Sequence, residues 1–285
     1  MRRKVKIKIC LCIALLLVAY FLNRKCEVIA VHPLRSIGQH DLKVMTWNVH
    51  CSTGADSEKQ KKIAGMILDI GADFVLLNEC NQDSCKLMDS ILKATYPFTE
   101  ETLSHDDCGD IFYSKRAMSD TGRVYEKVRA KRIQPIKATI AVGVDSVKII
   151  GVHMTSNHYD STIGGESSKD SSFVARYKNA QNWRNFQSHG IKEAVLMTKH
   201  HVIVMGDMND FSCSAPLDTL ALCGLRDSWW EGGNGYGATY HKGCFRLRID
   251  HILYSEKLHL ESIKVIETKL SDHNPVVASF SLLKE

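Results

Sequence analysis

The sequence predicts an α/β fold in which two β-sheets pack face to face and helices cover their outer sides. Three observations support this prediction. Short apolar runs of strand length recur from residue 42 to residue 283, segments with amphipathic helical spacing separate several of them, and the last runs follow one another without a helix between, as in antiparallel pairs. Strands and helices arranged in this way form layered folds that bury both faces of each sheet.

The elements are expected in the following order along the chain. Strands are expected at residues 42–49, 73–78, 147–152, 201–205, 248–254, 258–266 and 276–283, with further β-like runs between residues 110 and 153. Helices are expected at residues 57–70, 82–95, 173–199 and 216–222. Ser57 is the expected N-cap of the first helix and Gly71 its end, while Gly190 is a candidate break in the third. This length and order predict one folded domain at residues 42–285.

The charge distribution separates the N-terminus from the rest of the chain. The formal net charge is +5 at pH 7, but seven positive charges surround the N-terminal apolar segment, which leaves −2 for the remainder. They are Arg2, Arg3, Lys4, Lys6, Lys8, Arg24 and Lys25. The remainder therefore lacks the strong net basic charge of most duplex-binding proteins, although a local basic face is compatible with this composition.

The N-terminus consists of a basic stretch, an apolar run over residues 9–22 and two further basic residues. The run is shorter than the ~20 residues of a free-standing membrane span and typical of a signal-peptide core, so an uncleaved anchor and a cleaved signal peptide are both open. More basic residues precede the run than follow it, which favours export of the domain. An anchor at residues 1–25 is preferred, because Arg24 and Lys25 separate the run from the nearest small residues, and a linker follows at residues 26–41. The expected location is a membrane anchor with an extracytoplasmic domain, and secretion after cleavage is the alternative.

Eight of the ten cysteines lie outside the apolar run. They are Cys26, Cys51, Cys80, Cys85, Cys108, Cys213, Cys223 and Cys244. In an oxidising compartment they could form disulfides, with a clip between Cys80 and Cys85 as one candidate, and buried free thiols are the alternative. No Cys-x-x-Cys occurs, so a structural zinc site is not expected.

Two oxygen-bearing side chains, Asp207 and Asn209, follow the apolar strand at residues 201–205. Residues i and i+2 of an extended chain point to the same side, so the carboxylate and the carboxamide share one face. Such a pair suits a hard divalent cation and the phosphate oxygens that the cation would polarise. An ordinary Asx turn is the alternative.

Other strands end or begin at residues of the same chemistry. Asn48, Glu79 and His153 each follow an apolar run, and Asp272 and His273 precede one. Each has a structural explanation on its own, as a strand-end residue, a solvated acid or a buried histidine. Together they are better explained by one shared site, because turn chemistry alone does not require Asp, Asn, Glu and His at every strand end.

Seven short motifs occur in the order found in the endonuclease/exonuclease/phosphatase superfamily, which the chain closely resembles over residues 42–283. The motifs are Thr46-Trp47-Asn48-Val49, Leu77-Asn78-Glu79, Gly109-Asp110-Ile111-Phe112-Tyr113-Ser114-Lys115, Gly151-Val152-His153, Gly206-Asp207-Met208-Asn209-Asp210, Arg248-Ile249-Asp250-His251-Ile252-Leu253 and Ser271-Asp272-His273-Asn274-Pro275-Val276. This superfamily of metal-dependent hydrolases includes deoxyribonuclease I, abasic-site endonucleases, sphingomyelinases and inositol polyphosphate 5-phosphatases. The resemblance implies a deoxyribonuclease I-like, four-layer α/β/β/α sandwich of two packed mixed sheets, here preceded by the N-terminal membrane segment.

The resemblance also implies a set of metal ligands. Glu79 is the first of them, and Asn48, Asp207, Asn209 and Asp272 complete or flank the coordination sphere. Carboxylate, carboxamide and water oxygens select Mg²⁺, with Mn²⁺ as a substitute.

The catalytic residues that the resemblance implies are His153, Asp207, Asn209, Asp250 and His273. His273 is the expected general base, with Asp250 orienting its ring, and Asp207 is the alternative residue that would hold the attacking water. His153 would bind a phosphate oxygen or protonate the leaving group. Asn209 would help to bind the phosphate.

Two residues beside these motifs are not assigned to the site. Asp110 stands where relatives often carry Asn, which puts any role for it in doubt. His251 follows Asp250 on a strand, so it should face the opposite side and pack there.

The sequence therefore predicts a Mg²⁺-dependent hydrolase of phosphoric esters, with a phosphodiesterase or endonuclease-like activity preferred. A phosphatase or a sphingomyelinase-like lipid phosphodiesterase is the alternative, and nucleic acid, phospholipid and inositol phosphate are all candidate substrates. A binding module that keeps the fold without the chemistry is less favoured, because none of the residues expected at the site is missing. The membrane is a second expected partner, through the N-terminal segment, and the chain is expected to be a monomer.

Overall fold

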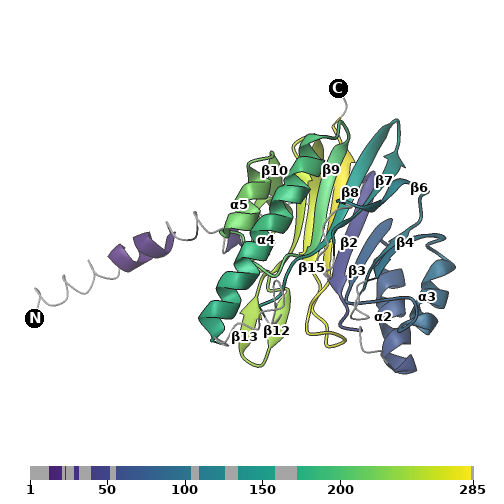
Figure 1. Ribbon diagram of the computed structural model, residues 1–285, viewed down its shortest axis with the longest axis horizontal. Coiled ribbons are helices and arrows are strands. Elements are labelled where there is room, and N and C mark those ends of the chain that lie inside the picture. The colour runs from purple at the N-terminus through teal and green to yellow at the C-terminus, as the bar shows by residue number, and fades with distance from the viewer. Residues whose placement is uncertain are drawn as a thin grey trace, which may run out of the picture.

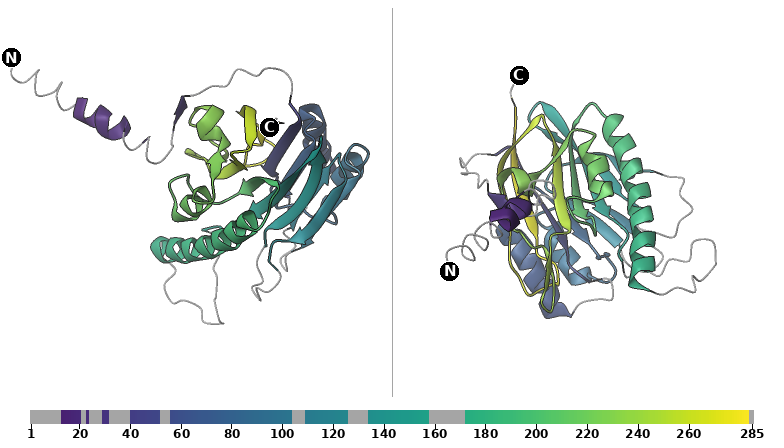
Figure 2. Two further views of the ribbon diagram at one scale, coloured as in Figure 1. Left: turned by 90° about the horizontal axis from the view of Figure 1, so that it is seen from above. Right: turned by 90° about the vertical axis from the view of Figure 1, so that its left-hand side faces the viewer.

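The computed structural model describes residues 13–20, 23, 29–31, 40–51, 56–103, 109–125, 134–157 and 172–283. In this part of the chain two six-stranded sheets pack face to face, and helices lie on the outer side of each, as Figure 1 and Figure 2 show. The predicted α/β fold with two packed mixed sheets is confirmed.

The first sheet has a parallel pair of strands at its centre. Its strand order is β15 (Leu258–Val265), β16 (Val276–Leu282), β2 (Leu42–Asn48), β3 (Phe74–Asn78), β5 (Gly109–Ser114) and β4 (Phe98–Leu103). Strands β2 and β3 are parallel, and the other neighbouring pairs are antiparallel. A parallel pair needs a crossover connection, which helix α2 (Ser57–Ile70) supplies.

The second sheet repeats this plan. Its strand order is β10 (Leu225–Asp227), β14 (Asp250–Ser255), β9 (His201–Asp207), β8 (Asp145–His153), β7 (Ile136–Val142) and β6 (Met118–Arg123). Only β8 and β9 are parallel, and helix α4 (Phe173–Leu196) lies on the crossover between them. In each sheet the two parallel strands therefore end side by side at the same edge.

Three apolar clusters hold the layers together. The cluster between the sheets includes Val44 from the first sheet and Ile149 from the second. Helices α2 and α3 (Lys86–Lys93) cover the outer face of the first sheet through a second cluster. Helices α4 and α5 (Ala215–Ala221) cover the outer face of the second sheet through a third. Burial on both faces explains why the central strands read as continuous apolar runs.

Helix α2 has the predicted limits but a different N-cap. The cap is Asp56 rather than Ser57, because the Asp56 carboxylate accepts a hydrogen bond from the backbone N–H of Lys59 at 2.7 Å. Gly71 ends the helix in the left-handed conformation, with φ 66°, as the sequence predicts.

Two other helices differ from the prediction. Helix α3 is shorter than the predicted span of residues 82–95, because its first residues form turns in which the Asn81 side chain accepts the N–H of Ser84 at 2.6 Å. Helix α4 continues through Gly190 without a break. The ring of Tyr125 lies 2.6 Å from the position that a Cβ would occupy there, so this glycine allows close packing rather than ending the helix.

Several elements have no clear signal in the sequence. They are β4, helix α6 (Ser228–Gly232), and strands β1 (Ala30–Val31), β11 (Asn234–Gly235), β12 (Tyr240–Lys242) and β13 (Phe245–Leu247). Strand β1 pairs with β11, and Ala30 is fully buried, so the chain ahead of the sandwich is attached to it at this point. Strands β12 and β13 form a hairpin.

The N-terminal segment is described only in part. Residues 13–20 form a helix whose side chains are exposed. Among the residues that the structure describes, no helix combines the length and apolar character needed to cross a membrane. Most of the predicted anchor at residues 1–25 and linker at residues 26–41 lies outside the described residues.

The candidate clip between Cys80 and Cys85 is not formed, and the alternative of buried free thiols is confirmed for this pair. Both are free thiols in fully buried positions, as is Cys51 close by. Four other cysteines, Cys10, Cys12, Cys26 and Cys108, lie outside the described residues.

Candidate active site

The C-terminal ends of the two parallel pairs meet at one edge of the sandwich. The residues there are Asn48 at the end of β2, Glu79 just after β3, His153 at the end of β8 and Asp207 at the end of β9. Strand β14 runs antiparallel to β9 with Asp250 opposite Asp207, so its first residue joins the same edge. The strand ends that the sequence singles out are thus brought together by the sheet topology itself.

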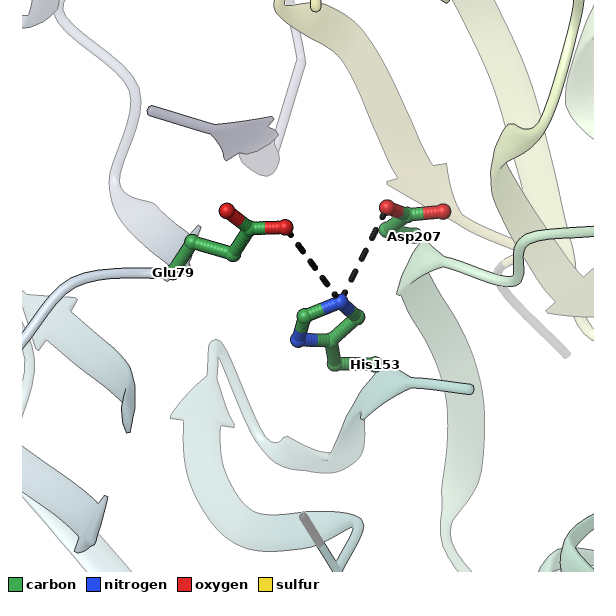
Figure 3. Close-up of side chains that lie close together, drawn as sticks. All are labelled: Glu79, His153 and Asp207. Carbon is green, nitrogen blue, oxygen red and sulfur yellow. Dashed lines mark ion pairs between the residues drawn. The ribbon is translucent and has the colours of Figure 1, made fainter. Parts of the chain in front are cut away.

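Glu79 and Asp207 come from different sheets and share the same partners. The Nδ2 of Asn48 donates to Glu79 Oε1 at 2.9 Å and to Asp207 Oδ2 at 3.1 Å. The Nδ1 of His50 lies 2.9 Å from Glu79 Oε2. Figure 3 shows His153 between the two carboxylates, with its Nε2 3.8 Å from Glu79 Oε1 and 3.9 Å from Asp207 Oδ2. The two carboxylates therefore face one small space.

The backbone around this space is held in an uncommon conformation. His50, Glu79 and Asn209 have φ values of 48°, 52° and 51°. Among the described residues only one other non-glycine residue, Asp120, has a positive φ. Such conformations cost on the order of 1–3 kcal/mol each and persist where the surrounding structure enforces them, as it often does at functional sites.

His273 forms a close carboxylate–imidazole pair with Asp250. Its Nδ1 lies 2.8 Å from Asp250 Oδ2, and its Nε2 lies 3.8 Å from Asp207 Oδ2. Burial lowers the pKa of His273, but the charges of Asp250 and Asp207 and the hydrogen bond with Asp250 raise it to about 10. The indole N–H of Trp47 donates to the His273 carbonyl oxygen at 2.9 Å. The ring is thus held with one nitrogen toward its carboxylate and the other toward the site.

His153 forms a second, longer pair with Asp110. Its Nδ1 lies 3.6 Å from Asp110 Oδ1, which also accepts a hydrogen bond from Asn78 Nδ2 at 2.8 Å. Burial lowers the pKa of His153, and Asp110 together with the central carboxylates raises it to about 9. Asp110, whose role the sequence leaves in doubt, therefore lies within the site and places a negative charge behind His153.

The pKa values of the two central carboxylates, Glu79 and Asp207, are shifted in opposite directions. Burial and the neighbouring Asp250 charge raise the pKa of Asp207 to about 6. Burial also opposes ionisation of Glu79, but the charge of His153 and hydrogen bonds led by that from Asn48 outweigh it and lower the pKa of Glu79. The concentration of acids at this edge creates a strongly negative local field.

The donor atoms at the site fit a hard divalent cation. Two groups of residues bring their donor atoms within 4.8 Å of one another: Glu79, His153 and Asp207, and Asp207, Asp250 and His273. Asp110 Oδ2 and Asp250 Oδ1 are buried and have no hydrogen-bond partner among the described residues. A set of carboxylate oxygens beside a carboxamide, without thiolates, suits a hard cation better than a soft one.

The remaining predicted ligands lie at the border of the site. The backbone N–H of Asn209 donates to Asp207 Oδ1 at 2.8 Å, which is an Asx turn, and its side chain donates to the Met154 carbonyl oxygen at 3.0 Å. The turn interpretation of this pair is therefore correct, and Asp207 lies at the site as well. Asp272 is partly exposed and contributes no donor atom to the two groups above.

His251 faces away from the site, as the strand alternation predicts. Its ring nitrogens lie 2.9 Å from Asp227 Oδ2 and 3.1 Å from the Asp210 carbonyl oxygen. It is a buried structural residue.

Asn78 and Tyr240 also border the site, although no role was predicted for either. The Oδ1 of Asn78 accepts the backbone N–H of Asp207 at 3.1 Å, which links the two sheets. Its place beside Glu79 at a strand end was the available signal. The ring of Tyr240 lies 4.9 Å from that of His273, centroid to centroid, but the hairpin that carries it has no sequence signature.

Arg184 of α4 lies behind the site and links the loops that follow β8 and β9. It is wholly buried, and its guanidinium donates to Asp210 Oδ2 at 3.0 Å, to the Thr155 carbonyl oxygen at 2.9 Å and to Asn157 Oδ1 at 3.0 Å. The loop that follows Asp207 is thereby fixed to the one that follows His153.

Comparisons with known proteins agree with this geometry. The profile of the endonuclease/exonuclease/phosphatase family matches residues 45–273. No curated protein matches the sequence. Among solved structures, the 3' phosphatase NExo from Neisseria, bound to product DNA hairpin, has a TM-score of 0.64 and 21% identity, covering 84% of this chain and 99% of that one.

Two further structures show the same likeness. A humanized form of TDP2 from D. rerio has a TM-score of 0.65 and 16% identity, covering 84% of this chain and 98% of that one. The human Nocturnin catalytic domain with a bound sulfate anion has a TM-score of 0.60 and 16% identity, covering 88% of this chain and 98% of that one. At these identities the likeness to each structure concerns the fold.

Proposed function

Because the chain belongs to the endonuclease/exonuclease/phosphatase family of metal-dependent phosphoric-ester hydrolases, we propose that it is a Mg²⁺-dependent phosphodiesterase, exported and tethered to a membrane. One observation carries the proposal for the chemistry. Glu79 and Asp207 are carboxylates from different sheets that face one space, and two histidines, each backed by its own acid, lie within 4 Å of Asp207 Oδ2.

The chain offers a coherent set of roles for this chemistry. Glu79 and Asp207, with Asn48 beside them, would hold the cation. A Mg²⁺ ion bound there would neutralise charge on the phosphoryl oxygens and, next to Asp207, oppose the protonated form of His273. His273 acts as the general base through Nε2, while Asp250 holds Nδ1 and stabilises the imidazolium that forms. Asp207 as the residue that holds the attacking water is the alternative.

His153 is the proposed donor to a phosphate oxygen or to the leaving group. Although burial lowers its pKa, Asp110 and the central carboxylates raise it to about 9, and its Nε2 faces the space between Glu79 and Asp207. Asp110 stands behind Nδ1 and supports the positive charge of the protonated ring. The two histidines thus divide the proton transfers, since one accepts a proton as the other donates one.

Nucleic acid is the substrate class that we favour over a lipid headgroup or an inositol phosphate. The Neisseria relative is named a 3' phosphatase and holds a product DNA hairpin. The chain beyond its basic N-terminus carries a net charge of −2, so binding would depend on contacts close to the site rather than on a broad basic face.

Hydrolysis of chromogenic esters tests the chemistry. The full chain should release p-nitrophenol from bis-p-nitrophenyl phosphate in Mg²⁺, and much less in EDTA or from His273→Ala. Faster hydrolysis of p-nitrophenyl phosphate than of the diester would show that the activity is that of a phosphatase rather than a diesterase. Activity that persists in EDTA would contradict the metal assignment. Plasmid DNA, RNA, sphingomyelin and inositol phosphates in the same assay then rank the natural substrate classes.

The charge bias around residues 9–22 supports the proposal of export. An alkaline phosphatase reporter fused after residue 285 should be active in cells, because that enzyme works only outside the cytoplasm. An inactive fusion, together with an active cytoplasmic reporter at the same position, would contradict export.

A further inference from the structure

The hairpin of β12 and β13 is joined directly to the catalytic segment. Tyr240 forms a β-bridge with His273, and the backbone N–H of His241 donates to the Asp272 carbonyl oxygen at 2.8 Å. Behind the hairpin, the Thr239 hydroxyl accepts the backbone N–H of Asp250 at 3.0 Å. Figure 1 shows the hairpin projecting beyond the ends of the sheet strands. These contacts fix its position relative to the candidate base and its carboxylate.

The register of the hairpin determines which side chains share a face. Lys242 is paired with Phe245, and Tyr240 with Leu247. Directly paired residues and residues two positions apart lie on the same face of an antiparallel pair, so Lys242 and Phe245 stand on the face of Tyr240. The Tyr240 ring packs on His273. Phe245 and Lys242 therefore come next along the face that begins at the catalytic histidine, about 6.8 Å farther out.

Phe245, near the hairpin tip, is unusually exposed for an aromatic side chain. It is 67% exposed, and its cross-strand partner Lys242 is exposed beside it. A phenylalanine side chain that is exposed to this extent contributes little packing energy to the stability of the fold. An accessible ring beside a cation is an arrangement with which proteins stack an unpaired nucleobase and contact its phosphate.

We propose that this hairpin is a stacking platform for single-stranded nucleic acid, with Phe245 under a base and Lys242, on the same face, on a flanking phosphate. The proposal rests on the proposed function and specifies its substrate class. The strand would run outward from the reacting phosphate at His273, past Tyr240, with the base of a neighbouring nucleotide on Phe245. Recognition of this kind needs few positive charges, which agrees with the net charge of −2 beyond the N-terminal segment.

Contact with a lipid surface is the competing explanation for an exposed phenylalanine beside a cation. The register places Phe245 on the face of Tyr240, so it lines the approach to His273 and can be reached by a base of the substrate strand. Binding to lipid vesicles, measured beside binding to the strand, separates the two explanations.

The test is binding without hydrolysis. Fluorescence anisotropy of a short labelled single strand, measured with the full chain in detergent and EDTA, reports affinity even if the enzyme never cleaves nucleic acid. Phe245→Ala should weaken binding on the order of 10- to 100-fold, which is the range for loss of one stacked base. Phe245→Trp should retain affinity, whereas Phe245→Leu should lose nearly as much as alanine, since leucine is apolar but cannot stack. Lys242→Gln should reduce both affinity and its dependence on salt.

A matched control and a second readout complete the experiment. Leu222 is 81% exposed at the end of α5, so Leu222→Ala removes an exposed apolar side chain away from the hairpin and should leave affinity unchanged. The bound strand should also slow alkylation of Cys244, which is exposed in the hairpin turn.

Two results would overturn the proposal. Equal binding by wild type and Phe245→Ala is one. The other is a variant that loses binding to phosphatidylserine vesicles while its binding to the single strand is unchanged. Failure of the proposed function is seen separately, as a lack of Mg²⁺-dependent hydrolysis of bis-p-nitrophenyl phosphate.

Discussion

Replacing Arg184 with methionine should destabilise the protein strongly, although the residue lies outside the catalytic set. Methionine fills similar volume but leaves the Asp210 carboxylate, only 1% exposed, without its cation. It also removes the donors to the Thr155 carbonyl and to Asn157. Removing one partner of a buried ion pair costs about 3–5 kcal/mol. For a domain of this size that lowers Tm by roughly 6–20 °C, at about 2–4 °C per kcal/mol.

Urea unfolding of four proteins measures this coupling. They are the wild type, Arg184→Met, Asp210→Asn and the double variant. Because each single change leaves a buried charge unpaired, the double variant should lose less than the sum of the singles, by about 0.5–3 kcal/mol. Arg226→Met is the control, since Arg226 pairs with Glu231 at only 4.0 Å on the surface and should cost less than about 1 kcal/mol. A loss below about 1 kcal/mol in Arg184→Met, or fully additive single losses, would refute the assignment of a buried, coupled pair.

Three further predictions follow from the site and its surroundings. Glu79→Gln should lose hydrolysis chiefly through weaker Mg²⁺ binding and recover partly at high metal concentration, so a titration that shows normal metal dependence and a near-normal rate would exclude Glu79 as a ligand. His273→Ala should lower kcat/KM by about 10²–10⁴-fold, and Asp250→Asn should lower it by less. The double variant should be scarcely slower than His273→Ala, because Asp250 acts through that ring. Multiplicative losses would show that the two residues act independently. Although burial opposes ionisation of Asp227, its arginine and histidine partners hold its pKa below the ordinary value. Its stabilising effect is therefore complete above the unfolded-state pKa of about 3.9 and lost as pH falls below it. Asp227→Asn should flatten the decline in unfolding free energy on acidification, and parallel declines in the two proteins would contradict this.

Most of the fold could be predicted because its signals are local. The buried strand at residues 201–205 and the helix that ends at Gly71 are specified by apolar spacing and by one glycine conformation. Strand β4 and the hairpin at residues 240–247 could not be found this way. Their residues do not follow a clear alternation of apolar and polar side chains, so they become strands only through pairing with neighbours. The late start of α3 also depends on a side chain outside the helix, that of Asn81.

The site residues likewise fall into those that local sequence signals predict and those that depend on pairing between strands. Asn48, Glu79, His153 and Asp207 could be predicted to meet because each lies at the end of a parallel strand. Asp110 could not be placed, because only the register of β3 and β5 sets it opposite Asn78. Arg184 did leave a trace in the sequence. The residues that share its buried helix face are Ala180, Gln187, Ser188, Ile191 and Val195, and a charge on such a stripe implies a buried partner.

The short pairing of β1 with β11 has a consequence for where the enzyme can act. Ala30 is held against the domain, so only seven residues of chain, or eight Cα–Cα steps, separate it from Leu22, the last residue of the apolar run. At about 3.5 Å per step, this connecting segment spans at most roughly 28 Å. A domain held by the proposed anchor would therefore remain within about its own diameter of the bilayer and could not explore the surrounding volume. Long polymers would be processed only as their ends or loops reach the membrane surface, which would make hydrolysis a property of that surface rather than of the bulk medium.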